Sequence, residues 1–323
     1  MSAEPDVRTE PVLANGPRPA NTWVYFNGQV CRYEDVHLGL MTHALHYGTG
    51  CFEGIRAYWN EKREQLYLLQ AAAHYERLKR SGKILRMEVP HDTETLIGIT
   101  LDVLRRNQFR TDTYIRPLLF KSVEQIGVQL HGLPETFAIY MVPFGKYVET
   151  ESGIRCMVSS WRRVSDESVP ARAKITGAYI NSALAKSEAL ESGYDEAIVL
   201  SSDGHVSEGS AENLFMIKDG KAFTPPVTDD ILEGVTRQLV MNLLRDEIGM
   251  PVLERSIDRT ELYTSDELLL CGTGAQISPV IEVDHRVVGD GRVGEITQEL
   301  QQIYFGAVRG ENQKFADWTI PVY

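Results

Sequence analysis

Ala171-Arg-Ala-Lys174-Ile-Thr-Gly-Ala-Tyr179, followed by Val206-Ser-Glu208-Gly-Ser-Ala-Glu-Asn213, is the stretch that decides the fold of this chain. The neighbours of Lys174 are small or apolar, a setting in which a lysine amine can attack an aldehyde. Tyr179 follows at the expected start of a helix. Most lysines are exposed and many tyrosines are core residues, so neither one indicates a function by itself.

Glu208 is the acid of this stretch, and it follows an expected strand. A carboxylate beside a pyridine nitrogen keeps that nitrogen protonated, which makes the ring an electron sink. Glu212 competes for the same role, and the sequence does not separate the two acids. A turn glutamate that faces solvent is the simpler interpretation of either one.

Two glycine-flanked segments could bind an anion. Gly234-Val235-Thr236 opens an expected helix, whose free amides attract negative charge. Gly272-Thr273-Gly274 follows an apolar run and can bring backbone amides close to a phosphate or carboxylate. A plain helix cap or turn would look the same. Only as a set, with Lys174, Tyr179 and Glu208, do these residues predict a site for pyridoxal phosphate.

Composition limits the classes of protein to consider. The 323 residues are 43% hydrophobic and 24% charged, which is ordinary for a globular protein with a large core. A net charge of -12 argues against general nucleic-acid binding. The chain has no signal-peptide pattern and no apolar run long enough to span a membrane, so we expect a cytoplasmic protein.

Cysteines and histidines give no metal or redox pattern. The cysteines are scattered without ligand or disulfide spacing and are interpreted as small core residues; they are Cys31, Cys51, Cys156 and Cys271. The eight histidines form no close ligand pair, so we expect no bound metal.

The chain divides into two expected domains. Residues 1–21 are a proline-containing arm, 22–142 a small N-terminal α/β domain, 143–152 an interdomain loop, and 153–323 a large C-terminal domain. Strands, hairpins and helices are mixed without regular alternation, which favours an α+β fold over a doubly wound sheet. Helices are expected at about 72–83, 93–106, 178–191, 235–248 and 295–307, and hairpin turns at Asn27-Gly28, Asp203-Gly204 and Asp219-Gly220.

Motifs along most of the chain resemble one family. They are His43-Ala-Leu-His-Tyr47-Gly48, Phe52-Glu-Gly-Ile-Arg56, Tyr114-Ile-Arg116-Pro, Ser159-Ser-Trp161, Lys174 to Tyr179, Ser207-Glu-Gly through Asn213-Leu-Phe215, Gly234-Val-Thr-Arg237 and Gly272-Thr273. From about Trp23 to Gly310 the chain resembles the fold-type IV pyridoxal-phosphate (PLP) enzymes, which have the two-domain, D-amino acid aminotransferase-like α+β fold. The motif Phe52 to Arg56 resembles the bacterial branched-chain amino acid aminotransferases in particular.

The resemblance implies a cofactor site at the domain interface. Lys174 would bind the cofactor covalently and move the proton between the substrate α-carbon and cofactor C4′. Tyr179 would hydrogen-bond the ring hydroxyl, and Glu208 would pair with the pyridine nitrogen. Phosphate-binding residues would be Arg77, Val235, Thr236 and Thr273.

The resemblance also implies a pocket with two kinds of substrate. The hydrophobic wall would be made by Tyr47, Phe52, Tyr114, Phe144 and Tyr147. Arg116 would receive the distal carboxylate of glutamate or 2-oxoglutarate through a two-pronged charged hydrogen bond. Thr273 and Gly274 would help to hold the substrate α-carboxylate. The reaction would be a ping-pong transamination of leucine, isoleucine or valine.

The resemblance also implies a homodimer or higher oligomer with sites completed across subunits. Tyr47 and Tyr114 would serve the neighbouring site.

Three departures from the family pattern bear on substrate range. Gly274 stands where alanine is usual, Ile175-Thr176 where small residues are usual, and the segment 123–134, expected over the pocket, differs. The alternatives are a transaminase for D-amino acids or (R)-primary amines and, ranked lower, a catalytically silent scaffold.

Overall fold

Two compact units make up the chain. The computed structural model describes residues 21–145 and 152–323. The first unit contains the described residues up to 145 together with 173–177 and 306–323, and the second contains 152–172 and 178–305. Most of the expected arm at 1–21 and of the expected loop at 143–152 therefore lies outside the described residues.

The first unit is built on an antiparallel sheet, which has eight strands among the described residues. Its order is β17-β5-β4-β6-β7-β1-β2, and β3 pairs with β6. The strands are β1 (Trp23–Phe26), β2 (Gln29–Arg32), β3 (Gly50–Phe52), β4 (Ile55–Asn60), β5 (Gln65–Leu69), β6 (Thr113–Lys121), β7 (Glu135–Pro143) and β17 (Thr319–Pro321).

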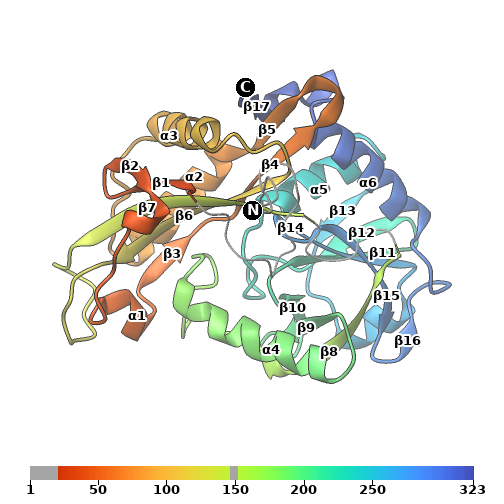
Figure 1. The fold of residues 1–323 in the computed structure, drawn as a ribbon. Helices are drawn as coiled ribbons and strands as arrows, with labels where there is room; N and C mark the ends of the chain where they lie inside the picture. The colour runs from red at the N-terminus through yellow and green to blue at the C-terminus, as the bar shows by residue number, and fades with distance from the viewer. Residues whose placement is uncertain (1–20, 146–151) are drawn as a thin grey trace, which may run out of the picture. The chain divides into compact units, whose positions relative to one another are not determined.

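Helices α1 (His43–Tyr47), α2 (Ala71–Ile84) and α3 (Thr93–Asn107) belong to this unit. The α3 helix starts where the Asp92 carboxylate accepts a hydrogen bond of 2.8 Å from the Thr95 amide, a standard N-cap. Figure 1 shows α2 and α3 beside each other along the first sheet, and α2 also contacts β3. The α2 helix thereby reaches the end of the strand that precedes Glu53.

The second unit contains a mixed sheet, with nine strands among the described residues. Its order is β10-β9-β8-β15-β14-β11-β12-β13, and β16 pairs with β15. The pairs β8–β9, β8–β15 and β12–β13 are parallel. The strands are β8 (Ile154–Arg162), β9 (Glu196–Leu200), β10 (Val206–Gly209), β11 (Asn213–Lys218), β12 (Lys221–Thr224), β13 (Val252–Glu254), β14 (Glu267–Gly272), β15 (Gln276–Val283) and β16 (Arg286–Val287).

Helix α4 (Tyr179–Glu191) packs on β8 and β9, and α5 (Val235–Asp246) packs on β14 and β13. Helix α6 (Glu295–Val308) follows later in the chain (Figure 1). The core of the sheet is formed by aliphatic residues, among them Val158, Leu200, Leu214 and Leu270. Short 3-10 helices lie at Tyr33–Asp35, Glu61–Arg63, Thr176–Ala178, Arg259–Thr264 and Gln313–Trp318.

The α+β class is confirmed, and each predicted helix forms with ends shifted by a few residues at most. The predicted hairpin turns at Asn27-Gly28, Asp203-Gly204 and Asp219-Gly220 also connect antiparallel strands. The sequence did not indicate β4, whose six residues are all buried, because such a strand lacks the alternation that marks a half-exposed one. Nor did it indicate that 173–177 and 306–323 group with the first unit.

Candidate active site

Lys174 belongs to the short segment 173–177 of the first unit and is held there by its backbone. Its carbonyl accepts a hydrogen bond of 3.0 Å from the Phe52 amide, and its own amide donates to the Ser81 hydroxyl at 3.1 Å. The ammonium nitrogen lies 5.2 Å from the centroid of the Phe52 ring. Lys174 therefore sits at the end of β3, beside an aromatic side chain that the family resemblance assigns to the substrate pocket.

The two unusual residues after the lysine take part in fixing this segment. Ile175 is buried and forms an isolated antiparallel bridge with Cys51. The Thr176 hydroxyl donates to the carbonyls of Gly48 and Gly50, at 3.0 and 3.1 Å. Gly48 adopts a φ of 63°, and a Cβ there would stand 2.6 Å from the Gly177 backbone. This close approach explains why glycine occupies position 48.

Arg77 on α2 is paired with Glu53, an acid of the motif Phe52 to Arg56. The Glu53 carboxylate accepts from Arg77 Nε at 2.7 Å and from Nη2 at 2.8 Å. His74, one turn earlier on the helix, places Nδ1 2.7 Å from the same carboxylate. Burial alone would raise the pKa of Glu53, but Arg77 and His74 outweigh it and hold that pKa well below its usual range. Burial lowers the pKa of His74.

Four of the predicted pocket residues lie together in the first unit. Tyr114 and Arg116 share one face of β6, and Arg116 Nη2 donates to the Tyr114 hydroxyl at 2.8 Å. The Arg116 guanidinium lies 4.2 Å from the Phe52 ring centroid, and the Tyr114 and Phe144 rings are 5.1 Å apart. Aromatic rings can pack against an apolar substrate chain, and an arginine beside them can bind a carboxylate.

Tyr47, at the end of α1, contacts the unusual segment 123–134. Its hydroxyl accepts a hydrogen bond of 3.2 Å from the Gly127 amide. His43 on the same helix lies 2.6 Å from the Gly127 carbonyl. These contacts tie the segment to α1. Tyr147 lies outside the described residues.

Glu208 on β10 is the anchored acid of the second unit. Its Oε1 pairs with Arg163 Nη2 at 2.9 Å, and its Oε2 accepts from Asn213 Nδ2 at 3.1 Å and from the Leu232 amide at 3.0 Å. The side chains of Glu208 and Arg163 are both largely buried. Arg163 was missed in the sequence because nothing local links it to Glu208; the strand pairing of β8, β9 and β10 brings them together.

Glu212 differs from Glu208, although the sequence could not separate them. Burial, together with the charge of Glu196, raises the pKa of Glu212 to about 8. Its Oε2 accepts from the Ala211 amide at 3.0 Å, while Glu196 pairs with Lys186 at 2.6 Å. The surroundings of Glu212 thus favour its neutral form, whereas Glu208 has an arginine to balance a negative charge.

The two predicted anion-binding segments of the second unit have different neighbours. Val235 and Thr236 are the first residues of α5, and Gly234 before them is packed against Asn213, the residue that donates to Glu208. Thr273 and Gly274 form the turn between β14 and β15, and Gly272 beside them lies close to the backbone of Ala211. Because Gly234 has no side chain, Asn213 can approach the helix start closely.

Tyr179 is the first residue of α4 and is half-buried. Two residues on, the Asn181 side chain donates to the Arg162 carbonyl at 2.9 Å. Since Arg162 precedes the arginine that pairs with Glu208, the start of α4 is tied to the strand end that holds that acid.

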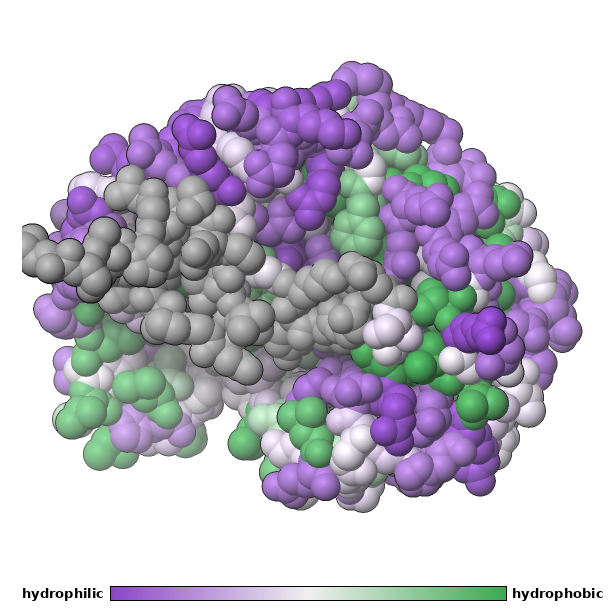
Figure 2. All heavy atoms as spheres, turned by 45° about the vertical axis from the view of Figure 1, so that its right-hand side comes forward, coloured by the Kyte–Doolittle hydropathy of each residue, from purple (hydrophilic) through white to green (hydrophobic). Residues whose placement is uncertain are grey.

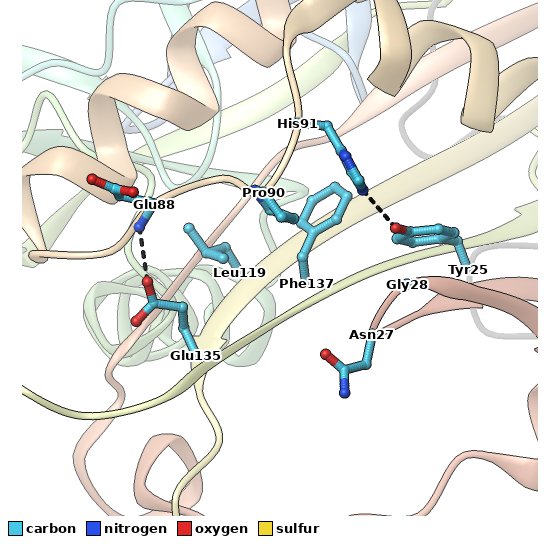
Figure 3. A pocket seen from close by; sticks show the side chains of 9 residues that line it. All are labelled: Tyr25, Asn27, Gly28, Glu88, Pro90, His91, Leu119, Glu135 and Phe137. Atoms are coloured by element: carbon cyan, nitrogen blue, oxygen red, sulfur yellow. Dashed lines mark hydrogen bonds between the residues drawn. The ribbon is translucent and has the colours of Figure 1, made fainter.

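A separate pocket of about 210 Å³ lies in the first unit and contains none of the predicted site residues. Figure 3 shows Tyr25 and His91 pointing toward each other, with 2.7 Å between their polar atoms. The Glu135 carboxylate accepts from the Glu88 amide at 3.0 Å. These polar groups bind one another, so the pocket is not a candidate for the chemistry of Lys174.

Neither a cluster of candidate metal ligands nor an apolar helix of membrane-spanning length occurs in the described part of the chain. Within residues 21–145 and 152–323, no three or more His, Cys, Asp or Glu side chains are grouped so as to hold a metal ion. No helix in these same ranges has the length and apolar character needed to cross a membrane.

Comparison with known proteins gives the same family from sequence and structure. The model of the family "Amino-transferase class IV" matches residues 50–283. A probable branched-chain-amino-acid aminotransferase of Aquifex aeolicus is 50% identical over 301 residues, which covers 93% of this chain and 97% of the relative.

Solved structures of related proteins indicate the same family. The Escherichia coli branched-chain amino acid aminotransferase superimposes with a TM-score of 0.89 at 40% identity, covering 94% of this chain and 100% of that one. The T.th. branched-chain amino acid aminotransferase, complexed with N-(5'-phosphopyridoxyl)-L-glutamate, gives 0.89 at 36% identity, with 94% and 99% covered. The chain belongs to the class IV aminotransferase family, among the branched-chain amino acid aminotransferases.

Proposed function

We propose that this protein is a PLP-dependent transaminase that moves an amino group between leucine, isoleucine or valine and 2-oxoglutarate by a ping-pong reaction. The observation that carries the proposal is Lys174, fixed by its backbone and placed 5.2 Å from the Phe52 ring, in a chain with full-length relatives of this activity. A related structure holding a phosphopyridoxyl-glutamate supports both the cofactor and the glutamate half of the reaction.

The residues present suit the cofactor. Lys174 would bind it covalently, Tyr179 would hydrogen-bond its ring hydroxyl, and Glu208 would pair with its pyridine nitrogen. Its phosphate would be held by Arg77, Val235, Thr236 and Thr273. When bound, the cofactor supplies an electron sink. The Arg163 pair and the two hydrogen-bond donors on the other oxygen of Glu208 keep this carboxylate in one orientation.

Lys174 also moves the proton at the substrate α-carbon, and the pocket residues orient that carbon. Phe52, Tyr114 and Phe144 provide the wall for an aliphatic side chain, with Tyr47 and Tyr147 as further members. Arg116 binds the distal carboxylate of 2-oxoglutarate. Thr273 and Gly274 receive the α-carboxylate.

The role of Lys174 is tested with Lys174→Ala. The wild-type protein with cofactor should show a visible absorbance band, and borohydride should attach the cofactor irreversibly to Lys174, as peptide mapping would reveal. Lys174→Ala should lose the band and its transaminase activity. Lys221→Ala, at an exposed position on β12, is the matched control and should keep both. Wild-type turnover by Lys174→Ala would rule out the assignment.

The role of Arg116 is tested by comparing two acceptors. Arg116→Met should weaken 2-oxoglutarate far more than 4-methyl-2-oxopentanoate, because only the first carries a distal carboxylate. Equal losses for the two acceptors would contradict the role.

The rival specificity, for D-amino acids or (R)-primary amines, is tested with the same protein. Gly274 and the segment 123–134 are where a difference would originate. Amino transfer to 2-oxoglutarate is measured from L-leucine, D-leucine and (R)-1-phenylethylamine. We expect turnover with L-leucine; a preference for either other donor would replace the branched-chain assignment.

We further propose a homodimer or a higher oligomer through an apolar surface of the first unit. The surface consists of exposed side chains on and around α1 and on the segment 123–134; they are Leu38, Leu40, Met41, Leu45, Ile126 and Val128. Leu40, Ile126 and Val128 are 89%, 82% and 80% exposed. Figure 2 shows hydrophobic side chains gathered at the lower left, the side on which α1 lies in Figure 1. Such a patch is unusual for a monomer.

A second copy is the proposed occupant of this apolar surface, and Tyr47 would serve the site of the partner. Tyr114 contacts Arg116 and Phe144 of its own subunit, so we assign it to the pocket of that subunit instead. Leu40→Glu with Ile126→Glu should shift the protein toward monomers in analytical ultracentrifugation. Val287→Glu, at an exposed position on β16, is the control and should leave the mass unchanged. A wild-type monomer would contradict the proposal.

A cytoplasmic location also stays a prediction, which cell fractionation can test.

A further inference from the structure

Glu53 is a charged side chain with no exposed surface, placed directly after β3. Its two carboxylate oxygens receive three polar contacts, two from Arg77 and one from His74, all between 2.7 and 2.8 Å. Its backbone amide donates to the Pro117 carbonyl at 2.9 Å, which ties it to β6. The carboxylate therefore has a fixed position relative to the sheet.

One face of α2 carries the residues that meet this acid and the lysine segment. His74, Arg77 and Ser81 are spaced by three and four residues, so they lie on the same side of the helix. His74 and Arg77 contact Glu53, and the Ser81 hydroxyl accepts from the Lys174 amide. A shift of α2 would therefore move the arginine and the lysine backbone together.

The contact between Glu53 and Arg77 has two opposite consequences for an anion that binds Arg77. Two parallel hydrogen bonds fix the plane of the guanidinium and so direct its remaining donors. The negative charge of Glu53 also offsets the positive charge of Arg77, which weakens the attraction of any further anion. The sign of the net effect can be measured.

We propose that Glu53 is a positioning residue for the cofactor phosphate, and that it acts by orienting Arg77, with His74 orienting Glu53 in turn. The inference rests on the proposed assignment of Arg77 to the phosphate. Orientation outweighs charge compensation here because Arg77 and Glu53 are both almost fully buried. In that setting a misdirected guanidinium cannot regain its hydrogen bonds from water.

The test compares PLP with pyridoxal, which lacks the phosphate. Dissociation constants of both are measured on the apoprotein by tryptophan fluorescence, and their ratio is the phosphate preference. Glu53→Gln removes the charge, and Glu53→Asp keeps the charge but shortens the reach. Both should lower the phosphate preference by about tenfold to a hundredfold, the value of one charge-assisted hydrogen bond. Pyridoxal binding should change little.

Controls separate this role from general loss of structure. Glu76→Gln, at an exposed position on α2, should leave the phosphate preference unchanged. If the Glu53 variants do not fold, His74→Phe removes the second contact while leaving the ion pair, and should lower the preference by a smaller factor in the same direction. An unchanged or raised preference in the Glu53 variants, or in His74→Phe where they do not fold, would overturn the proposal.

The double variant Glu53→Gln/Arg77→Met tests the assignment of Arg77 by itself, since it leaves no unpaired buried charge. It should lose most of the phosphate preference. If it keeps the wild-type preference, Arg77 does not bind the phosphate and the underlying assignment fails. If it loses the preference while Glu53→Gln, Glu53→Asp and His74→Phe keep it, only the positioning role of Glu53 fails.

Discussion

Glu53 in the first unit and Glu212 in the second are both almost completely buried, yet their surroundings favour opposite charge states. Glu53 has a bidentate arginine and a histidine, and its pKa is held well below the usual range. Glu212 has a backbone amide and a nearby acid, and its pKa is raised to about 8. Burial is the same in both cases, so the partners determine which form is stable.

The pair therefore predicts opposite pH dependence of stability. Glu53 has a lowered folded-state pKa, so its contribution is present above the ordinary glutamate range and is lost as the pH falls. Glu212 has a raised folded-state pKa, so its contribution is present at low pH and is lost as the pH rises toward about 8.

The largest expected effect is on folding, in Glu53→Ala. This change leaves the buried Arg77 guanidinium without its carboxylate, which should lower the free energy of unfolding by about 3–5 kcal/mol. Glu212 must take up a proton to fold at neutral pH, so Glu212→Ala should lose much less stability than Glu53→Ala or be more stable than the wild type. Urea unfolding of the two apoproteins at neutral pH measures both. Similar losses would show that the two acids do not differ in charge.

The next effect is on catalysis, in Glu208→Gln. On the proposed pairing of Glu208 with the pyridine nitrogen, losing this charge should reduce kcat by about a hundredfold or more. Glu212→Gln should keep kcat within about threefold, because an amide replaces a carboxyl group that is already largely neutral at pH 7. Steady-state rates with L-leucine and 2-oxoglutarate decide between them. The reverse ranking would make Glu212 the ring acid.

The pH profile of stability in Glu212→Gln should show a smaller change for each pH unit. Between pH 4.5 and 8 the wild type should lose stability relative to the variant, by at most roughly 1.4 kcal/mol per pH unit. The reason is that the unfolded chain releases the Glu212 proton in this range while the folded chain retains it. Thermal melts of both proteins across this range give the difference, which should level off above about pH 8. A constant difference would mean that Glu212 is ionised when folded.

The smallest effect is expected for an exposed acid, in Glu76→Gln. Glu76 pairs with Lys79 at 3.2 Å on the surface of α2, where water screens the charges. The free energy of unfolding should change by less than about 0.5 kcal/mol. The same urea titration measures it. A loss comparable to that of Glu53→Ala would remove the contrast between buried and exposed pairs.

Local patterns in the sequence predicted a large part of the fold. Helical spacing indicated α2, α3, α4, α5 and α6, and turn pairs such as Asn27-Gly28 indicated hairpins. Strands buried on every residue, such as β4, gave no alternation to detect. The pairing of β17 with β5 joins residues some 250 positions apart, which no local rule anticipates.

The residues of the candidate site also fall into those that the sequence indicated and those that it did not. Lys174, Tyr179, Glu208 and Thr236 stood out because their chemical types follow one another in an order that suits one cofactor, and the family resemblance added Arg77. Arg163, Glu53 and His74 did not, although the spacing of His74 and Arg77 on one helix face could have indicated a shared partner. Their partners come from other strands and helices, and only the folded chain brings them within hydrogen-bond distance.

By itself, the sequence determined the α+β class and the residues suited to a pyridoxal cofactor, because these depend on residue type, order and local spacing. The tertiary structure decided the return of residues 173–177 to the first unit, the pairing of Glu208 with Arg163, and the difference between Glu53 and Glu212. The physical reason is that the charge of a buried acid depends on which groups surround it, and those groups come from distant parts of the chain.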